Sequence, residues 1–128
     1  MPKTARQKII DKLDKITSEI VRTRDGYKCV MCGSTKRPQN GHVFSRRANA
    51  LKWDIRSDGN CHTQCATHNF LHSQKDSYPY WKWYQDKFGI DRFNELRREW
   101  QMITHLKMHD LREKYEQLKI VRESLSDK

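Results

Sequence analysis

The chain has 128 residues, of which 35% are hydrophobic and 33% are charged. This length and composition exclude several separate domains and a large apolar core, so we expect one domain over residues 1–128, stabilised at its centre by a bound metal. The 26 Lys and Arg residues outnumber the 16 Asp and Glu residues, which gives a formal net charge of +10. A polyanion such as nucleic acid is the expected partner, because each phosphate that is neutralised releases counterions.

Nothing in the sequence indicates export or membrane insertion. Residues 1–12 contain no continuous apolar stretch, and no uncharged apolar run approaches the roughly 18 to 20 residues that span a bilayer. We therefore expect a cytoplasmic protein without membrane contact. In that reducing compartment, the four cysteines are expected to bind metal rather than to form disulfides.

The segment 4–25 is predicted to be a helix. Its apolar residues recur in steps of four and three and so share one helical face: Ile9, Leu13, Ile16 and Ile20. Gly26 is a typical stop signal after such a helix. We expect the apolar face to pack over the centre of the domain.

The segment 27–76 is predicted to be a zinc-stapled core. Cys29 and Cys32 have the C-x2-C spacing with which one backbone turn supplies two zinc ligands, and Gly33 permits the sharp bend. Residues 41–45 are consistent with the first strand of a hairpin, and a helix is expected to begin near Gln64.

The second pair of zinc ligands has two interpretations. Cys65 and His68 repeat the x2 spacing, whereas Cys61 and Cys65 are separated by three residues. We favour Cys65 and His68, because residues i and i+3 share a face on the first turn of a helix, and Cys61 then becomes a small buried residue. In either case four protein ligands leave no position for water, so the zinc is expected to be structural.

The connection between the two predicted strands is basic and irregular. Its candidate DNA-binding residues are Arg46, Arg47, Lys52, Trp53 and Arg56. Such a composition suits a wall that binds the phosphate backbone, and it equally suits a solvated loop.

The segment 77–128 is predicted to be a helical region. Pro79 lies near a helix start, Gly89 ends the ring-rich run 80–84, and these rings are expected in the core rather than as base-stacking platforms. One long helix or two in series follow from residue 91 to about residue 124. This part is too polar to stand alone, so it folds back on the N-terminal helix or pairs with a second copy in a homodimer.

Hydrolysis of a phosphodiester needs a base, a cation and a group that fixes the tautomer of the base. His42 is the candidate base, and Asn60 is a candidate to hold its ring. Asn69 and His72 are three residues apart on one helical face and can hold a second, catalytic cation such as Mg²⁺ or Mn²⁺. A surface contact to phosphate is the alternative for His72.

These motifs resemble the HNH (ββα-metal) endonucleases with a treble-clef zinc site. They are most similar to the phage recombination nucleases called Rap or NinG, over about residues 27–96. The matching segments are Cys29 to Gly33, Gly41-His42, Asn60 to Asn69, Pro79-Tyr80 and Phe88-Gly89.

The resemblance implies a ββα-metal core with a short hairpin, within an α+β and mostly helical fold. It also implies that His42 is the general base, Asn60 the central asparagine and Asn69 a cation ligand, with His62 as a further site candidate. Branched DNA, such as Holliday junctions and D-loops, is the implied substrate. Many HNH enzymes carry an aspartate directly before the base, where this chain has Gly41.

Two other classes of function fit parts of the same pattern. A non-catalytic zinc module that binds nucleic acid would need neither His42 nor Asn60 nor Asn69. An interaction protein would use its long terminal helices to recruit a partner, with the zinc centre as a scaffold. The order of His42, Asn60 and Asn69 favours the nuclease.

Overall fold

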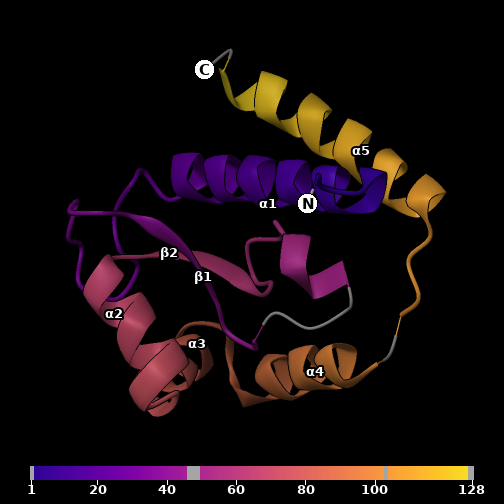
Figure 1. Ribbon diagram of the computed structural model, residues 1–128. Helices are drawn as coiled ribbons and strands as arrows, with labels where there is room; N and C mark the ends of the chain where they lie inside the picture. Colours follow the sequence, from indigo (N-terminus) through magenta and orange to yellow (C-terminus); the bar gives the residue numbers. More distant parts are fainter. Residues whose placement is uncertain (1, 46–49, 103, 127–128) are drawn as a thin grey trace.

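The computed structural model describes residues 2–45, 50–102 and 104–126, in which a small sheet lies among helices (Figure 1). Strands β1 (Gln39–His42) and β2 (Cys61–Gln64) pair antiparallel. The helices are α1 (Ala5–Arg24), the 3₁₀-helix η1 (Ala50–Trp53), α2 (Ala66–Phe70), the π-helix η2 (Leu71–Lys75), α3 (Tyr78–Phe88), α4 (Ile90–Gln101) and α5 (Met108–Ser126). The prediction of an α+β, mostly helical fold with a short hairpin is confirmed.

The hairpin is covered by helices. Its paired residues are Gln39–Gln64, Asn40–Thr63, Gly41–His62 and His42–Cys61. Helix α1 lies against it where the Thr63 hydroxyl donates to the carbonyl of Val21 (3.3 Å). Helix α3 lies against it where the Tyr80 hydroxyl donates to the carbonyl of Gly41 (2.9 Å). All four residues of β2 are buried, so this strand holds the start of α2 in a fixed place.

Local signals set both ends of α1. The backbone amide of Gln7 donates to the Thr4 hydroxyl (3.1 Å), which caps the first turn. Gly26 adopts a φ of +68°, a left-handed conformation that stops the helix at little cost. The Arg24 guanidinium donates to the carbonyl of Cys61 (2.8 Å) and so fastens the end of α1 to the hairpin.

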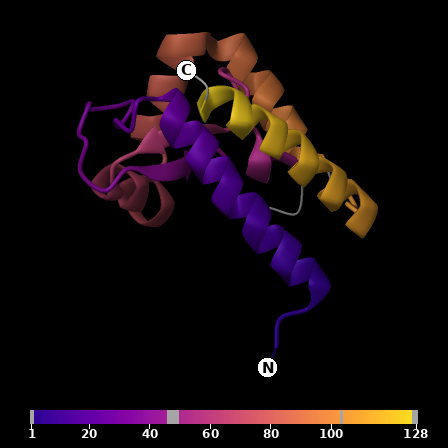
Figure 2. The ribbon, with the colours of Figure 1, turned by 90° about the horizontal axis from the view of Figure 1, so that it is seen from above.

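Helix α5 folds back along α1, as Figures 1 and 2 show. The buried residues between them are Leu13, Ile16 and Ile20 of α1, Trp53 of η1, and Leu111 and Leu118 of α5. Arg122 also pairs with Glu19 across the two helices (3.2 Å). Of the two arrangements that the sequence allowed, the structure shows the fold-back, which uses the apolar stripes of both helices within one chain.

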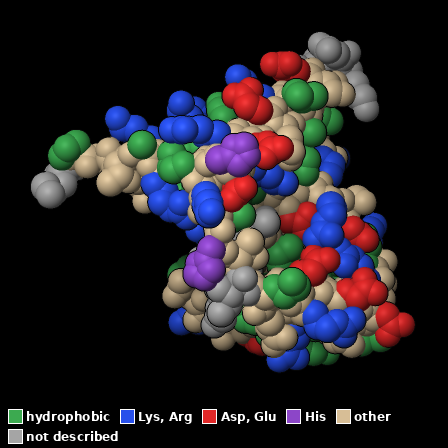
Figure 3. All heavy atoms as spheres, turned by 90° about the vertical axis from the view of Figure 1, so that its right-hand side faces the viewer, with side chains coloured by type: hydrophobic (Ala, Val, Ile, Leu, Met, Phe, Trp, Pro, Cys, Tyr) green, Lys and Arg blue, Asp and Glu red, His purple; other side chains and the backbone are tan. Residues whose placement is uncertain are grey.

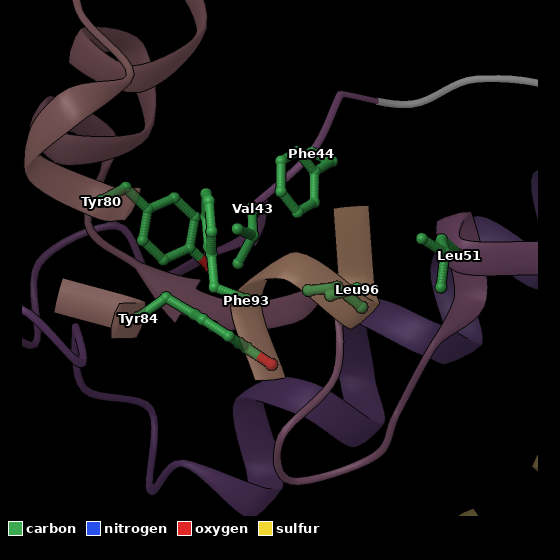
Figure 4. Close-up of a cluster of buried hydrophobic side chains, with 7 residues drawn as sticks. All are labelled: Val43, Phe44, Leu51, Tyr80, Tyr84, Phe93 and Leu96. Carbon is green, nitrogen blue, oxygen red and sulfur yellow. The ribbon is translucent and has the colours of Figure 1, made fainter. Parts of the chain in front are cut away.

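A second cluster lies on the other side of the hairpin, beneath α3 and α4 (Figure 4). Its buried residues are Val43, Phe44, Leu51, Tyr80, Tyr84, Phe93 and Leu96. The ring-rich run therefore contributes to the core, as expected. The sequence predicted either one long helix or two helices after residue 91. The structure shows two, since α4 ends at Gln101 and α5 begins at Met108.

Charged side chains cover much of the surface. On the face in Figure 3, Lys and Arg side chains lie among Asp and Glu rather than in one uninterrupted basic patch. Exposed pairs such as Lys3–Asp11 and Lys82–Asp86 (2.6 Å each) add little to stability. Among the described helices, none combines the length and the apolar character that a membrane crossing needs.

The packing of α5 on α1 predicts a contrast between two neighbouring positions. Leu118→Ala should lower the free energy of unfolding by about 2–5 kcal/mol, because it leaves a cavity in the core. Ile120→Ala is the matched control, since Ile120 is 68% exposed whereas Leu118 is 1% exposed. Urea denaturation of both variants measures the difference, and equal losses would contradict this packing.

Candidate functional site

The first pair of candidate zinc ligands, Cys29 and Cys32, lies on a tight turn between α1 and β1. Gly33 closes the turn with a φ of +76°, and its amide donates to the carbonyl of Cys29 (2.8 Å). The amide of Val30 donates to the carbonyl of Thr63 (2.9 Å), which attaches the turn to β2. The two thiols are thus held beside the end of the hairpin.

The second pair comes from the start of α2. Cys65 directly precedes that helix and His68 lies in its first turn, so both side chains point toward the first pair. The ligand atoms of Cys29, Cys32, Cys65 and His68 all lie within 4.8 Å of one another. The structure therefore assembles a Cys3His group from two segments that are far apart in the sequence.

The spacing within this group fits zinc. A tetrahedral zinc separates two sulfur ligands by about 3.8 Å, and a sulfur from an imidazole nitrogen by about 3.5 Å. Sγ of Cys32 lies 3.9 Å from Sγ of Cys65, and Nδ1 of His68 lies 3.6 Å from Sγ of Cys29 and 3.2 Å from Sγ of Cys65. Burial opposes ionisation of Cys29, but backbone amides that donate to its sulfur outweigh burial and lower the pKa of the thiol. Zinc can therefore bind this group.

Cys61 lies outside that group. Burial, and then the nearby charge of Asp54, raise the pKa of its thiol to about 12. Its sulfur donates to the carbonyls of Lys52 (3.5 Å) and Leu51 (3.7 Å). Of the two ligand sets that the sequence allowed, the structure brings together the one that contains His68.

A cavity of about 400 Å³ lies beside β1. Its walls come from β1 and the segment after it, from α2 and η2, and from α3 and α4. The lining residues are Asn40, His42, Val43, Phe44, Ser45, Asn69, His72, Ser73, Ser77, Trp81 and Trp100. Three predicted site residues, His42, Asn69 and His72, therefore share one cavity.

The ring of His42 is held in one tautomer. Its Nε2 lies 3.0 Å from the carbonyl oxygen of Lys52, which can only accept, so Nε2 carries the proton. The lone pair of the neutral ring then resides on Nδ1. His42 is half-buried, which is compatible with entry of a water and a phosphate.

Asn60 holds the segment that positions His42, rather than the ring that we expected it to hold. Its side-chain amide donates to the carbonyls of Phe44 (3.0 Å) and Leu51 (3.2 Å) and accepts from the amide of Phe44 (2.8 Å). Leu51 directly precedes Lys52, whose carbonyl accepts from His42. Asn60 is thus a positioning residue that acts through the backbone.

Asn69 and His72 lie where the helix widens from α2 into η2. The amide of Asp76 donates to the carbonyl of Leu71, a five-residue step that is typical of a π-helix and is frequent at functional sites. The Asn69 side chain donates to the Gln39 side chain (2.8 Å), which leaves its carbonyl oxygen as an acceptor. His72 donates through Nε2 to the carbonyl of Val43 (2.9 Å), and burial lowers its pKa.

Two residues of the cavity lining each contain a buried atom with an unused lone pair. Oδ1 of Asn40 and Nδ1 of His72 are buried and have no hydrogen-bond partner among the described residues. Such atoms are rare because the burial of a polar atom without a partner is costly. Sequence reasoning missed Asn40, although the two-residue period of a strand places it on the same face as His42.

Packing explains why position 41 is glycine. A Cβ atom on Gly41 would lie 2.0 Å from Oε1 of Gln64, which is fully buried. An aspartate therefore has no room at Gly41 in this packing. The described lining of the cavity contains no Asp or Glu.

The structure does not bring His62 to the cavity. Its ring is buried against Trp83 and Phe88, and Nε2 donates to the carbonyl of Gly59 (2.8 Å). Burial, and then the charge of Arg24, lower its pKa to about 4. The ring is therefore a neutral part of the core and lies apart from the cavity that His42, Asn69 and His72 line.

Most of the predicted DNA-binding wall is used elsewhere or is not described. Trp53 is 3% exposed and donates to Asp14 (2.8 Å), so it belongs to the core. Lys52 places its ammonium 5.5 Å from the centre of the Trp53 ring. Arg46 and Arg47 lie outside the described residues.

Arg56 is engaged in an ion-pair network. Its guanidinium donates to Asp54 (2.8 Å) and Glu99 (2.7 Å), and hydrogen bonds to these two carboxylates raise its pKa. Asp54 also accepts from the amide of Asn60 (2.9 Å), and Asp58 pairs with Arg92 (3.1 Å). Arg56 thus links its own loop to α4, and none of these three carboxylates lines the cavity.

The metal group predicts different outcomes for two buried cysteines. Cys65→Ser should release zinc and destabilise the fold, because the turn and α2 lose their common ligand. Cys61→Ser should keep one zinc per chain. Elemental analysis of the purified variants measures the zinc content, and zinc loss from Cys61→Ser alone would contradict the assignment.

Burial of neutral His62 predicts a pH dependence of stability. Its folded pKa of about 4 lies below the ordinary 6.5, so the unfolded chain binds the extra proton between these values. The contribution of His62 to the free energy of unfolding should be fully present above about pH 6.5. The free energy of unfolding should then fall by about 3 kcal/mol as the pH drops toward 4. Urea unfolding of wild type and His62→Gln across this range tests it. Equal slopes in the two proteins would contradict it.

Comparison with known proteins addresses the ancestry of the chain. A family model described as "Bacteriophage Lambda NinG protein" matches residues 3–125. Neither the curated proteins nor the solved structures that we compared with the chain gave a significant match. The predicted resemblance to NinG is confirmed at the level of the family and extends to both terminal helices. Because the match spans almost all of its 128 residues, the chain belongs to the phage NinG family.

Proposed function

We propose that this protein is a metal-dependent endonuclease that hydrolyses phosphodiester bonds in DNA. The observation that carries the proposal is the shared cavity, which joins a tautomer-fixed His42 to Asn69 and His72. The Cys3His group includes His68, the residue directly before Asn69 in α2, so a zinc ion bound to this group would hold Asn69 in place. A histidine, an amide and a second imidazole around one opening suit phosphodiester hydrolysis.

The roles of the residues follow from their hydrogen bonds. Nδ1 of His42 accepts the proton of the attacking water, while the carbonyl of Lys52 stabilises the imidazolium through Nε2. Asn40, Asn69 and His72 would hold a divalent cation such as Mg²⁺ or Mn²⁺. When bound, that cation supplies charge stabilisation for the phosphate and the leaving oxygen.

Branched DNA is the substrate that we propose. The NinG family is associated with phage recombination, a process in which branched DNA arises, and the net charge of +10 favours a polyanion. Recombination in an infected cell would place the protein in the host cytoplasm. A homodimer would match the two symmetric strands of a junction.

A non-catalytic zinc module that binds nucleic acid is the second candidate. One observation favours it, namely that no carboxylate is found among the described residues of the cavity. Such a module would bind DNA with the same affinity whether or not magnesium is present, and it would leave the strands intact.

The proposal predicts that His42→Ala abolishes cleavage of a forked or four-way DNA and leaves DNA binding and zinc content unchanged. Loss of a general base costs about 10²–10⁴-fold in rate. His109→Ala is the control, because His109 is exposed on α5. Gel analysis with and without magnesium measures cleavage, and a parental rate in His42→Ala would remove that residue from the mechanism.

A further inference from the structure

The cavity beside β1 has a second wall that hydrolysis does not require. Trp81 and Trp100 line it together with His42 and Asn69. We infer that these indoles bind an unstacked nucleobase beside the scissile phosphate, so that the site selects DNA with an unpaired nucleotide at the cleavage position. This inference rests on the proposed nuclease function and names the substrate feature that the site recognises.

Both indoles are tied to the backbone that continues from His42. Nε1 of Trp81 donates to the carbonyl of Val43 (2.7 Å), and Nε1 of Trp100 donates to the carbonyl of Ser45 (3.0 Å). Each ring is therefore positioned by a backbone carbonyl that lies close to the candidate base His42 in the sequence. A base that stacks on them lies in a fixed relation to the imidazole.

Phe44 makes the aromatic wall rigid. Its buried ring stacks on Trp100, with centroids 5.3 Å apart and an angle of 22° between the ring planes, and its centroid lies 5.7 Å from that of Trp81. The three rings come from the segment after β1, from α3 and from α4, and their order is established when the core folds. A ligand that stacks on this wall does not have to immobilise it, which removes part of the entropic cost of binding.

A nucleobase is the ligand that this chemistry fits. Every base has a flat π-face that can stack on an indole, and a cavity of about 400 Å³ falls in the range of sites that enclose a small planar group. The polar end at His42 and Asn69 is suited to the phosphate of the same nucleotide. In an intact duplex both faces of a base are stacked, so only an unpaired base enters at small cost.

Trp83 provides an internal comparison. It also lies on α3 and is half-buried, but its ring packs against His62 and Phe88 and is not part of the cavity. A general effect of aromatic loss on stability should therefore be seen at Trp83 and Trp100 alike. An effect on base recognition should be seen at Trp100 alone.

The experiment uses the full chain with His42→Ala, which stops cleavage. A forked DNA with one unpaired 5-iodouracil at the branch is photocrosslinked, and the attached peptide is identified by mass spectrometry. We expect attachment at Trp81 or Trp100. In binding titrations, Trp100→Leu should lower the preference for the fork over a paired duplex about fivefold or more, since stacking contributes about that much per base.

If Trp100→Leu folds poorly, two further variants still test the inference. Trp100→Tyr retains a ring and should retain most of the preference, and Trp83→Phe should retain all of it. Attachment only at residues outside the cavity, or an unchanged preference in folded Trp100→Leu, would overturn the inference. If the wild-type protein cleaves the fork with magnesium while Trp100→Leu keeps the preference for the fork over the duplex, the proposed base binding is contradicted and the proposed nuclease function is supported. If the DNA is crosslinked to the indoles but the wild-type protein cleaves no DNA, base binding is supported and the nuclease function is contradicted.

Discussion

The rest of the structure depends on one junction, where the turn of Cys29 and Cys32 meets the first turn of α2. The Cys3His group brings these two segments together, and the hydrogen bond from the amide of Val30 to the carbonyl of Thr63 attaches the turn to β2. A small, highly charged chain has little hydrophobic free energy to hold such parts together. The position of Asn69 relative to β1 therefore depends on this junction as well as on β2, which runs directly into the start of α2.

Much of the fold could be predicted from the sequence because its signals are local. Apolar residues in steps of three and four indicated α1, and Gly26 and Gly33 marked the turns that the structure shows. The spacing of Cys65 and His68 could be interpreted because both lie on one helical turn. These features depend on neighbours within a few residues.

The parts that could not be predicted depend on contacts between distant segments. Trp53 and Arg56 lie in a basic loop and look like a DNA-binding surface, but Trp53 packs under α1 and Arg56 pairs with Glu99 of α4. His62 matches a motif, yet alternation along β2 turns it toward α3. Asn60 contacts the backbone of Leu51, nine residues away. No spacing rule indicates which partner a loop residue will meet.

The close approach of Gln64 to Gly41 limits how this site can change over evolutionary time. A carboxylate directly before His42 would collide with the buried side chain of Gln64, so that side chain would have to move or shrink before one at 41 could grow. Asn40 offers a shorter route, since a single change to aspartate would put a negative charge on the same face of the strand as His42. In this packing, an acidic side chain beside His42 is thus accommodated more readily at position 40 than at position 41.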